Sequence, residues 1–224
     1  LHNNGGIIFE LDYLPISWNY LDTIRRYRET YNSPNSEGKA VDWYTRKAFV
    51  DHFFSPNDSI EHFHNMSYEE EGDFIGTVYD VKEINRDRNE ILMEKEGKVH
   101  TSTDRTKQKI KIEKRFIFNP NSINVGYVIK NIDSGKTDYI FGSEINLSFS
   151  STGRESHRLY NVVKNEKKEI GNDMCSIDHM RKLLIKDMTN SVAVTFSASK
   201  EYQLWNLPIT TDVKHHDSVE TFYQ

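Results

Sequence analysis

The sequence predicts an all-β protein of antiparallel strands with few short helices. The first observation is period-two alternation, because residues 109–118 carry apolar side chains on one face and mostly charged ones on the other. The apolar face comprises Ile110, Ile112, Phe116 and Phe118. The second observation is a series of short strand patterns separated by polar turn residues, which is typical of an antiparallel sandwich. The third is aromatic content, since 12 Tyr and 12 Phe residues favour strands over helices.

The N-terminal part of the sequence is predicted to contain a strand, a short helix and a surface loop. Gly6–Tyr13 is nearly continuous in apolar character and predicts a first strand that stops before Pro15. Asn19–Tyr31 places apolar residues at helical spacing and predicts the one short helix that we expect. Asn32–Lys39 has the composition of a surface loop. Trp43–Phe54 fits both a helical turn and a strand, and the sequence does not decide between them.

The remaining chain is mostly strand by pattern. The apolar face of residues 109–118 leads through a turn at Asn119–Asn121 into the next strand. Asp133–Lys136 predicts a hairpin-type connection. Two charged or polar stretches, Asn85–Thr106 and Ser150–Asp173, predict exposed loops. The predicted strands are Lys109–Phe118, Val125–Ile129, Tyr139–Phe149, Leu183–Ile185, Val192–Phe196 and Tyr202–Leu207.

Composition excludes several classes of protein. The net charge of −5 gives no basic excess for binding nucleic acid or an anionic membrane, and no stretch reaches the roughly 20 apolar residues of a membrane span. Cys175 is the single cysteine, so an internal disulfide is impossible and a cytoplasmic location is expected. The chain begins without a Met, and we expect a fragment of a longer protein.

Four segments together resemble a known family. They are GGIIFELDYLPISWNYLDTIRRYR at Gly5–Arg28, VDWYTRKAFVDHFFSP at Val41–Pro56, YIFGSEIN at Tyr139–Asn146, and LWNLPITTDVKHHDSVETFYQ at Leu204–Gln224. In order and spacing they resemble the C-terminal β-sandwich domain of glycoside hydrolase family 57 enzymes, the α-amylase and 4-α-glucanotransferase group. The resemblance implies a galactose-mutarotase-like supersandwich with residues 1–224 as a single domain.

The resemblance also implies a function. The catalytic Glu and Asp of that family lie on an N-terminal barrel, and its motifs have no counterpart in this chain, so no catalytic residue is expected here. The expected role is a non-catalytic accessory domain that supports the barrel and can line the α-glucan cleft. The expected partners are therefore that barrel and an α-glucan. Two alternatives stay open: an independent carbohydrate-binding module and, less favoured, a mutarotase-like sugar epimerase.

Four residues are candidates for substrate binding. Glu144 and Asn146 stand at i and i+2 on the polar face of a strand, so their side chains project the same way. They contact a sugar if that face lines a groove and are solvated if it does not. Trp18 and Tyr20 lie close to Pro15 in a polar stretch, where we expect aromatic rings exposed for stacking on sugar. Core packing is the competing role of these rings.

Five residues are predicted to form a structural seam, meaning a packed boundary within the core. They are Asp42, Trp43, Arg46, Asp51 and His52, in a segment dense in aromatic residues. Buried charges are tolerated only when paired, so we expect the charged members to satisfy one another. An epimerase would instead use His52 or His64 with Glu144 as acid and base.

Neither a metal nor a cofactor is expected. His62 and His64 have a spacing that zinc ligands can use, but zinc needs three or four ligands and the sequence offers no further tight cluster. No glycine-rich phosphate loop occurs in the sequence.

Overall fold

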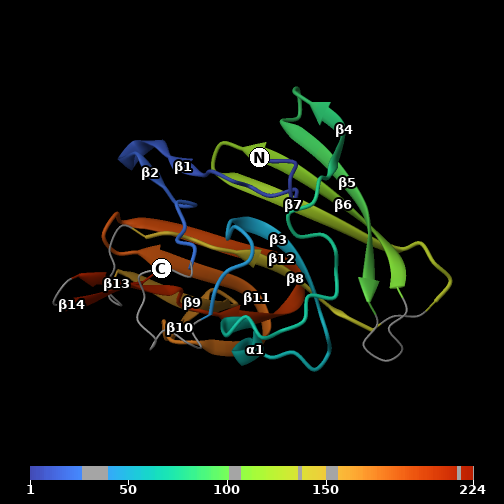
Figure 1. The fold of residues 1–224 in the computed structure, drawn as a ribbon. Helices are drawn as coiled ribbons and strands as arrows, with labels where there is room; N and C mark the ends of the chain where they lie inside the picture. Colours follow the sequence, from blue (N-terminus) through green and yellow to red (C-terminus); the bar gives the residue numbers. More distant parts are fainter. Residues whose placement is uncertain (27–39, 101–106, 136–137, 150–155, 216–217, 224) are drawn as a thin grey trace. The chain divides into compact units, whose positions relative to one another are not determined.

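The computed structural model describes residues 1–26, 40–100, 107–135, 138–149, 156–215 and 218–223, with the backbone alone from residue 211 onward. Within this part the fold is nearly all antiparallel β, which confirms the predicted fold class (Figure 1). No helix in the described part is long and apolar enough to cross a membrane. The elements are β1 Asp12–Tyr13, η1 Leu14–Ile16, β2 Trp18–Asn19, β3 Ala48–Phe54, α1 Ile60–His64, β4 Asp80–Asn85, β5 Glu90–His100, β6 Lys107–Asn119, β7 Ser122–Asn131, β8 Ile140–Ile145, β9 His157–Val163, β10 Glu166–Ile170, β11 Cys175–Asp187, β12 Val192–Asn206, β13 Thr210–His215 and β14 Ser218–Tyr223.

The chain divides into two compact units, and each is assembled from separate stretches of sequence. Unit 1 comprises Leu1–Glu10, Trp43–Asp58 and Tyr68–Asn146. Unit 2 comprises Leu11–Asp42, Ser59–Ser67 and Leu147–Gln224.

Unit 1 has two β layers. Its four-stranded sheet has the order β4-β5-β6-β7, and β3 pairs with β8 to form the second layer. In the sheet, Ile112 of β6 stands between Lys95 of β5 and Ile129 of β7. The alternation predicted for this strand is confirmed, because Ile110, Ile112 and Phe116 are fully buried. The layers meet through aromatic contacts such as that of Phe49 with Phe116, whose ring centroids are 6.1 Å apart.

Strand β3 is buried on both faces, unlike an ordinary surface strand. Its pairing with β8 shifts register between Ala48 and Val50, and Phe49 adopts a φ of 67° at this bulge. Because alternate residues point to opposite faces, Asp51 and His52 are both buried but in different surroundings.

Unit 2 is built on a sheet with the order β10-β9-β11-β12. Leu159, Met180, Leu183 and Ile185 form its buried cluster, against which Phe149 and Phe196 pack. The last two predicted strands are one continuous strand, β12.

Two predictions for the N-terminal part are wrong. Gly6–Tyr13 is not one continuous strand, because Gly5 and Gly6 adopt φ values of 83° and 55°, Ile7 and Ile8 form only isolated bridges, and just Asp12–Tyr13 is a strand, β1. Residues 20–26 are not helical. The Asn19 side chain accepts hydrogen bonds from the Leu21 and Leu11 N–H groups, and such bonds compete with a helix. The rest of that predicted helix, and the loop at residues 32–39, lie outside the described residues.

The predicted polar loops are also partly wrong. Asn85–Thr106 contains β5, and Ser150–Asp173 contains β9 and β10. Charged side chains in these strands form ion pairs with residues of neighbouring strands. For example, Lys111 Nζ of β6 lies 2.6 Å from Glu94 Oε2 of β5. Asp133–Lys136 does not join a hairpin, because β7 pairs with β6 whereas β8 pairs with β3.

Candidate functional site

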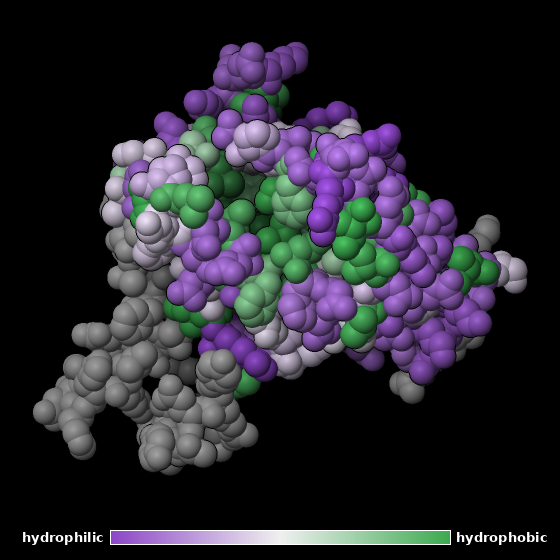
Figure 2. Space-filling model, turned by 90° about the horizontal axis from the view of Figure 1, so that it is seen from above, coloured by the Kyte–Doolittle hydropathy of each residue, from purple (hydrophilic) through white to green (hydrophobic). Residues whose placement is uncertain are grey.

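Residues 43–46 of unit 1 alternate between exposed and buried side chains. Trp43 and Thr45 are exposed, whereas Tyr44 and Arg46 are buried. The Trp43 indole is 53% exposed and meets the Tyr44 ring edge-on, with the ring centroids 4.9 Å apart. Figure 2 shows one face of the molecule, where hydrophobic side chains are exposed among hydrophilic ones.

Glu144 on β8 is the acceptor for three buried side chains of this region. Arg46 Nη1 lies 2.5 Å from its Oε1 atom. The Tyr44 hydroxyl donates to its Oε2 atom at 2.7 Å, and His52 Nε2 lies 2.9 Å from the same oxygen. Both carboxylate oxygens are therefore committed to internal contacts.

The Glu70 carboxylate contacts the second ring nitrogen of His52 and balances its charge. His52 Nδ1 lies 2.8 Å from Glu70 Oε2, while Glu70 Oε1 accepts the N–H groups of Phe53 and Gly72. A neutral imidazole has only one N–H, so two carboxylate partners require the imidazolium form. With Arg46 and Glu144, the four charges of this first network sum to zero.

The ionisation of this network follows from its geometry. Burial opposes the charged form of His52, but hydrogen bonds and charges from Glu144 and Glu70 outweigh it and raise the pKa of His52 to about 9. Burial likewise opposes the charged form of Glu144, but His52 and Arg46 outweigh it and lower the pKa of Glu144 to about 2. Both groups are charged at neutral pH.

A second network lies on the opposite face of β3. Lys114 of β6 is fully buried, with its Nζ atom 2.7 Å from Asp51 Oδ2, and the Tyr79 hydroxyl donates to the same oxygen at 2.5 Å. The ammonium also donates to the carbonyl of Phe49 at 2.8 Å and to that of Gly6 at 3.0 Å. Burial raises the pKa of Asp51 and lowers that of Lys114, and their mutual contact opposes both changes.

The five residues of the predicted seam differ in their surroundings. Asp42, Arg46, Asp51 and His52 are buried and ion-paired, as expected. They do not satisfy one another in the predicted way, because their partners come from distant parts of the sequence. Asp42 of unit 2 pairs with Arg26 at 2.8 Å, and the cation beside Asp51 is Lys114. Trp43 was expected to be packed, and this expectation is wrong.

The four predicted substrate-binding residues are divided between the two units. In unit 2, Tyr20 is 3% exposed and donates to Asp187 Oδ2 at 2.9 Å, so its predicted exposure is wrong. Trp18 is half-buried and donates to the Ser148 carbonyl at 2.9 Å. In unit 1, Asn146 is half-buried and its amide nitrogen donates to the Lys47 carbonyl. Their role in binding a substrate stays a prediction.

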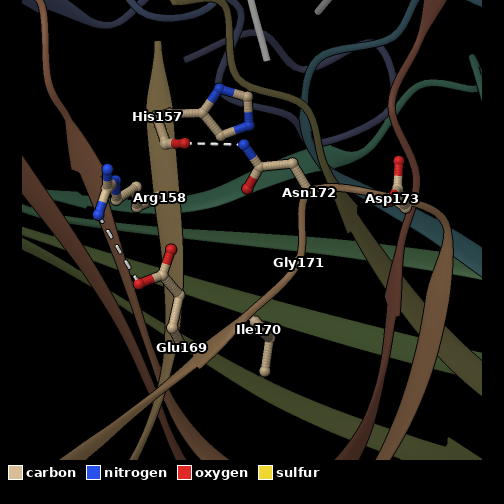
Figure 3. Close-up of a pocket in the computed structure, with 7 residues that line it drawn as sticks. All are labelled: His157, Arg158, Glu169, Ile170, Gly171, Asn172 and Asp173. Atoms are coloured by element: carbon tan, nitrogen blue, oxygen red, sulfur yellow. Dashed lines mark hydrogen bonds and ion pairs between the residues drawn. The ribbon is translucent and has the colours of Figure 1, made fainter. Parts of the chain in front are cut away.

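A separate polar pocket of about 260 Å³ lies in unit 2 (Figure 3). Asn172 Nδ2 donates to the His157 carbonyl at 2.8 Å, and Arg158 Nη1 lies 3.9 Å from Glu169 Oε2. None of the predicted site residues lines this pocket. Among the described residues, no group of three or more His, Cys, Asp or Glu side chains could hold a metal ion.

Sequence reasoning missed Lys114, Tyr79 and Glu70. A signal was present for Lys114, which stands in the buried register between Ile112 and Phe116 and is the polar exception there. No local signal marks Tyr79 or Glu70, because their partners on β3 are 28 and 18 residues away in sequence.

The fold is all-β, and the buried charged residues of the two networks in unit 1 serve internal ion pairs. The chain belongs to the family of alpha-amylase/4-alpha-glucanotransferase C-terminal domains, whose model matches residues 35–214. Its assignment to glycoside hydrolase family 57 stays a prediction.

Named relatives agree with this family. The chain is 27% identical over 196 residues to an alpha-amylase of Pyrococcus abyssi, covering 75% of this chain and 28% of that protein. It is 26% identical over 174 residues to a 4-alpha-glucanotransferase of Thermococcus litoralis, covering 66% and 25%. The chain thus spans about a quarter of the length of these curated relatives.

The crystal structure of the Thermococcus litoralis 4-alpha-glucanotransferase shares the fold. The two structures match with a TM-score of 0.78 at 22% identity, covering 99% of this chain and 31% of that chain.

Proposed function

We propose that this chain is a non-catalytic C-terminal domain of an α-glucan-acting enzyme of the 4-α-glucanotransferase or α-amylase type. Residues 1–224 act as one β-sandwich domain that supports an N-terminal catalytic barrel of the same polypeptide and contributes to the glucan cleft. The observation that carries the proposal is the family match over residues 35–214, in a chain that covers only 25–28% of its curated relatives.

The ionisation of the buried groups supports a non-catalytic role. Glycoside hydrolysis needs a carboxylic acid that stays protonated near neutral pH and a second carboxylate beside the substrate. The lowered pKa of Glu144 and its three internal partners do not suit it for the first task. His52 is bound at both ring nitrogens and fully buried, so it does not suit the acid–base role of an epimerase.

An α-glucan is the proposed ligand class, because the relatives are named alpha-amylase and 4-alpha-glucanotransferase. Asn146 and Trp18 keep partly exposed side chains and stay candidate contacts, whereas Glu144 and Tyr20 are engaged in internal contacts. An independent carbohydrate-binding module is the second candidate, and the exposed indole of Trp43 favours it. A cytoplasmic location stays part of the proposal.

The Thermococcus litoralis enzyme offers a direct test, because the matched 31% of its chain can be exchanged. Three proteins are compared: the intact enzyme, the enzyme without that region, and a chimera that carries this chain in its place. We expect the chimera to exceed the truncated enzyme in maltoheptaose transfer or in resistance to thermal inactivation. A matched chimera with Asp51→Asn should lose part of this gain. Equal behaviour of the truncated enzyme and the chimera would contradict a supporting role.

A further inference from the structure

We propose that the Trp43 indole, with Thr45 two residues further on in the sequence, is the surface on which unit 1 stacks a glucose unit of an α-glucan. This inference rests on the proposed function, which supplies the ligand class, and adds the residues that make the contact. From the sequence, core packing is the favoured role of Trp43 and a sugar platform is the alternative.

Trp43 is the largest of the exposed hydrophobic residues in the described part of the chain. Large aromatic side chains contribute much of the apolar surface that protein cores bury, yet Trp43 is 53% exposed. Its ring meets the Tyr44 ring edge-on. The exposed part of this indole can gain from covering the apolar face of a pyranose ring, because both surfaces are then removed from water.

The Trp43 indole is also held in place by Tyr44 and the buried network that Tyr44 joins. Tyr44 contacts the Trp43 ring, and its hydroxyl donates to Glu144, which is fixed by Arg46 and His52. These partners are buried and mutually neutralised, so they anchor the segment without competing for a ligand at the surface. Binding to a pre-positioned ring loses less conformational entropy than binding to a mobile one.

Thr45, two residues after Trp43 in the sequence, supplies an exposed hydroxyl. It is exposed, whereas Tyr44 and Arg46 on either side of it are buried. Its hydroxyl can donate and accept hydrogen bonds, which is the chemistry that a sugar hydroxyl needs. One ring and one hydroxyl cover only part of a ligand, so we expect an affinity in the millimolar range, about −4 kcal/mol.

The test is a titration of the 224-residue chain with maltoheptaose, followed by NMR shifts of backbone amides. Trp43→Ala is expected to weaken binding about tenfold, and Trp43→Phe, which keeps a flat ring, to weaken it less. Thr45→Ala is expected to have a smaller effect than Trp43→Ala. The matched control is Phe9→Ala, since Phe9 is an exposed aromatic residue of the same unit at 48% exposure and should leave the affinity unchanged.

The outcomes separate this inference from the proposed function. If the wild type binds maltoheptaose and Trp43→Ala binds it equally well, the assignment of Trp43 is wrong while glucan binding stands. If Phe9→Ala weakens binding as much as Trp43→Ala, the effect is not specific to Trp43 and the assignment is also wrong. If the wild type shows no shift at all, both the assignment and the glucan contact in the proposed function are overturned. Circular dichroism of each variant confirms that the comparison is made between folded proteins.

Discussion

His52 Nε2 lies 2.9 Å from Glu144 Oε2, and this contact joins β3 to β8 within a buried charge network. The contact fixes the protonation of both groups, because Glu70 occupies the other ring nitrogen of His52 and only the imidazolium can serve two carboxylates. A histidine that stays charged in the core makes stability depend on pH in a direction that can be stated in advance.

The stability of the chain should fall as the pH rises from about 6.5 to about 9. The folded pKa of His52, about 9, lies above the ordinary value of 6.5, so its contribution is complete below 6.5 and disappears as the pH passes 9. The contribution is on the order of 3 kcal/mol. Urea unfolding between pH 6 and 9 measures it. His52→Gln should be less stable at pH 6 and should flatten this dependence, and an unchanged slope in that variant would rule out His52 as the source.

Acid should act through Glu144. Its folded pKa of about 2 lies below the ordinary 4.5, so its contribution is complete above 4.5 and is lost as the pH falls toward 2. Glu144→Gln should therefore reduce the free energy of unfolding at pH 6 more than at pH 3. An equal loss at both values would mean that the carboxylate is not ionised in the folded protein.

Asp51 and Lys114 should behave as a coupled pair. Either change alone, Asp51→Asn or Lys114→Met, leaves an uncompensated buried charge and should cost about 3–5 kcal/mol. The double variant should be at least about 1 kcal/mol more stable than the sum of the two losses predicts. Chemical denaturation of the four proteins gives this coupling energy. Simple additivity would show that the two charges do not depend on each other.

Gly6 should tolerate a side chain less well than Gly76. Both have a positive φ, but a Cβ on Gly6 would meet the Tyr79 ring at 3.0–3.3 Å, whereas one on Gly76 meets nothing within 4 Å. Gly76→Ala should cost about 1 kcal/mol of backbone strain, and Gly6→Ala about 1–3 kcal/mol more. Thermal unfolding of the two variants compares them. Equal losses would mean that the Tyr79 ring moves aside freely.

The all-β class could be predicted because alternation in β6 is a local property of residues 109–118. The charged strand β5 could not be predicted in this way. Its Glu94 is stabilised by Lys111 from the neighbouring strand, and the local sequence of β5 does not show this contact. A polar stretch with cross-strand partners therefore has the same pattern as a solvated loop.

The buried polar residues of β3 were predicted, but their partners were not. Asp51 and His52 lie in an apolar segment and so must be paired, which is a statement about local composition. The partner of Asp51 is 63 residues away at Lys114, and one partner of His52 is 92 residues away at Glu144. Trp43 shows the converse, because a tryptophan in an apolar segment was expected to be packed and is exposed instead.

Trp43→Ala should therefore have little effect on folding. A side chain that is about half exposed contributes less than a core aromatic, and the expected loss is about 1 kcal/mol or less rather than the 3–5 kcal/mol of a buried ring. Urea unfolding measures this loss, with a buried aromatic such as Phe53→Ala as the contrast. A loss above about 3 kcal/mol would place Trp43 in the core and remove it as a glucan contact.

The most direct test of a non-catalytic glucan domain is to incubate the purified 224-residue chain with maltoheptaose and follow reducing ends and product lengths. The account predicts that maltoheptaose stays intact, with neither hydrolysis nor transfer above a protein-free control. Release of reducing sugar, or redistribution of chain lengths, that a point mutation within this chain abolishes would contradict it.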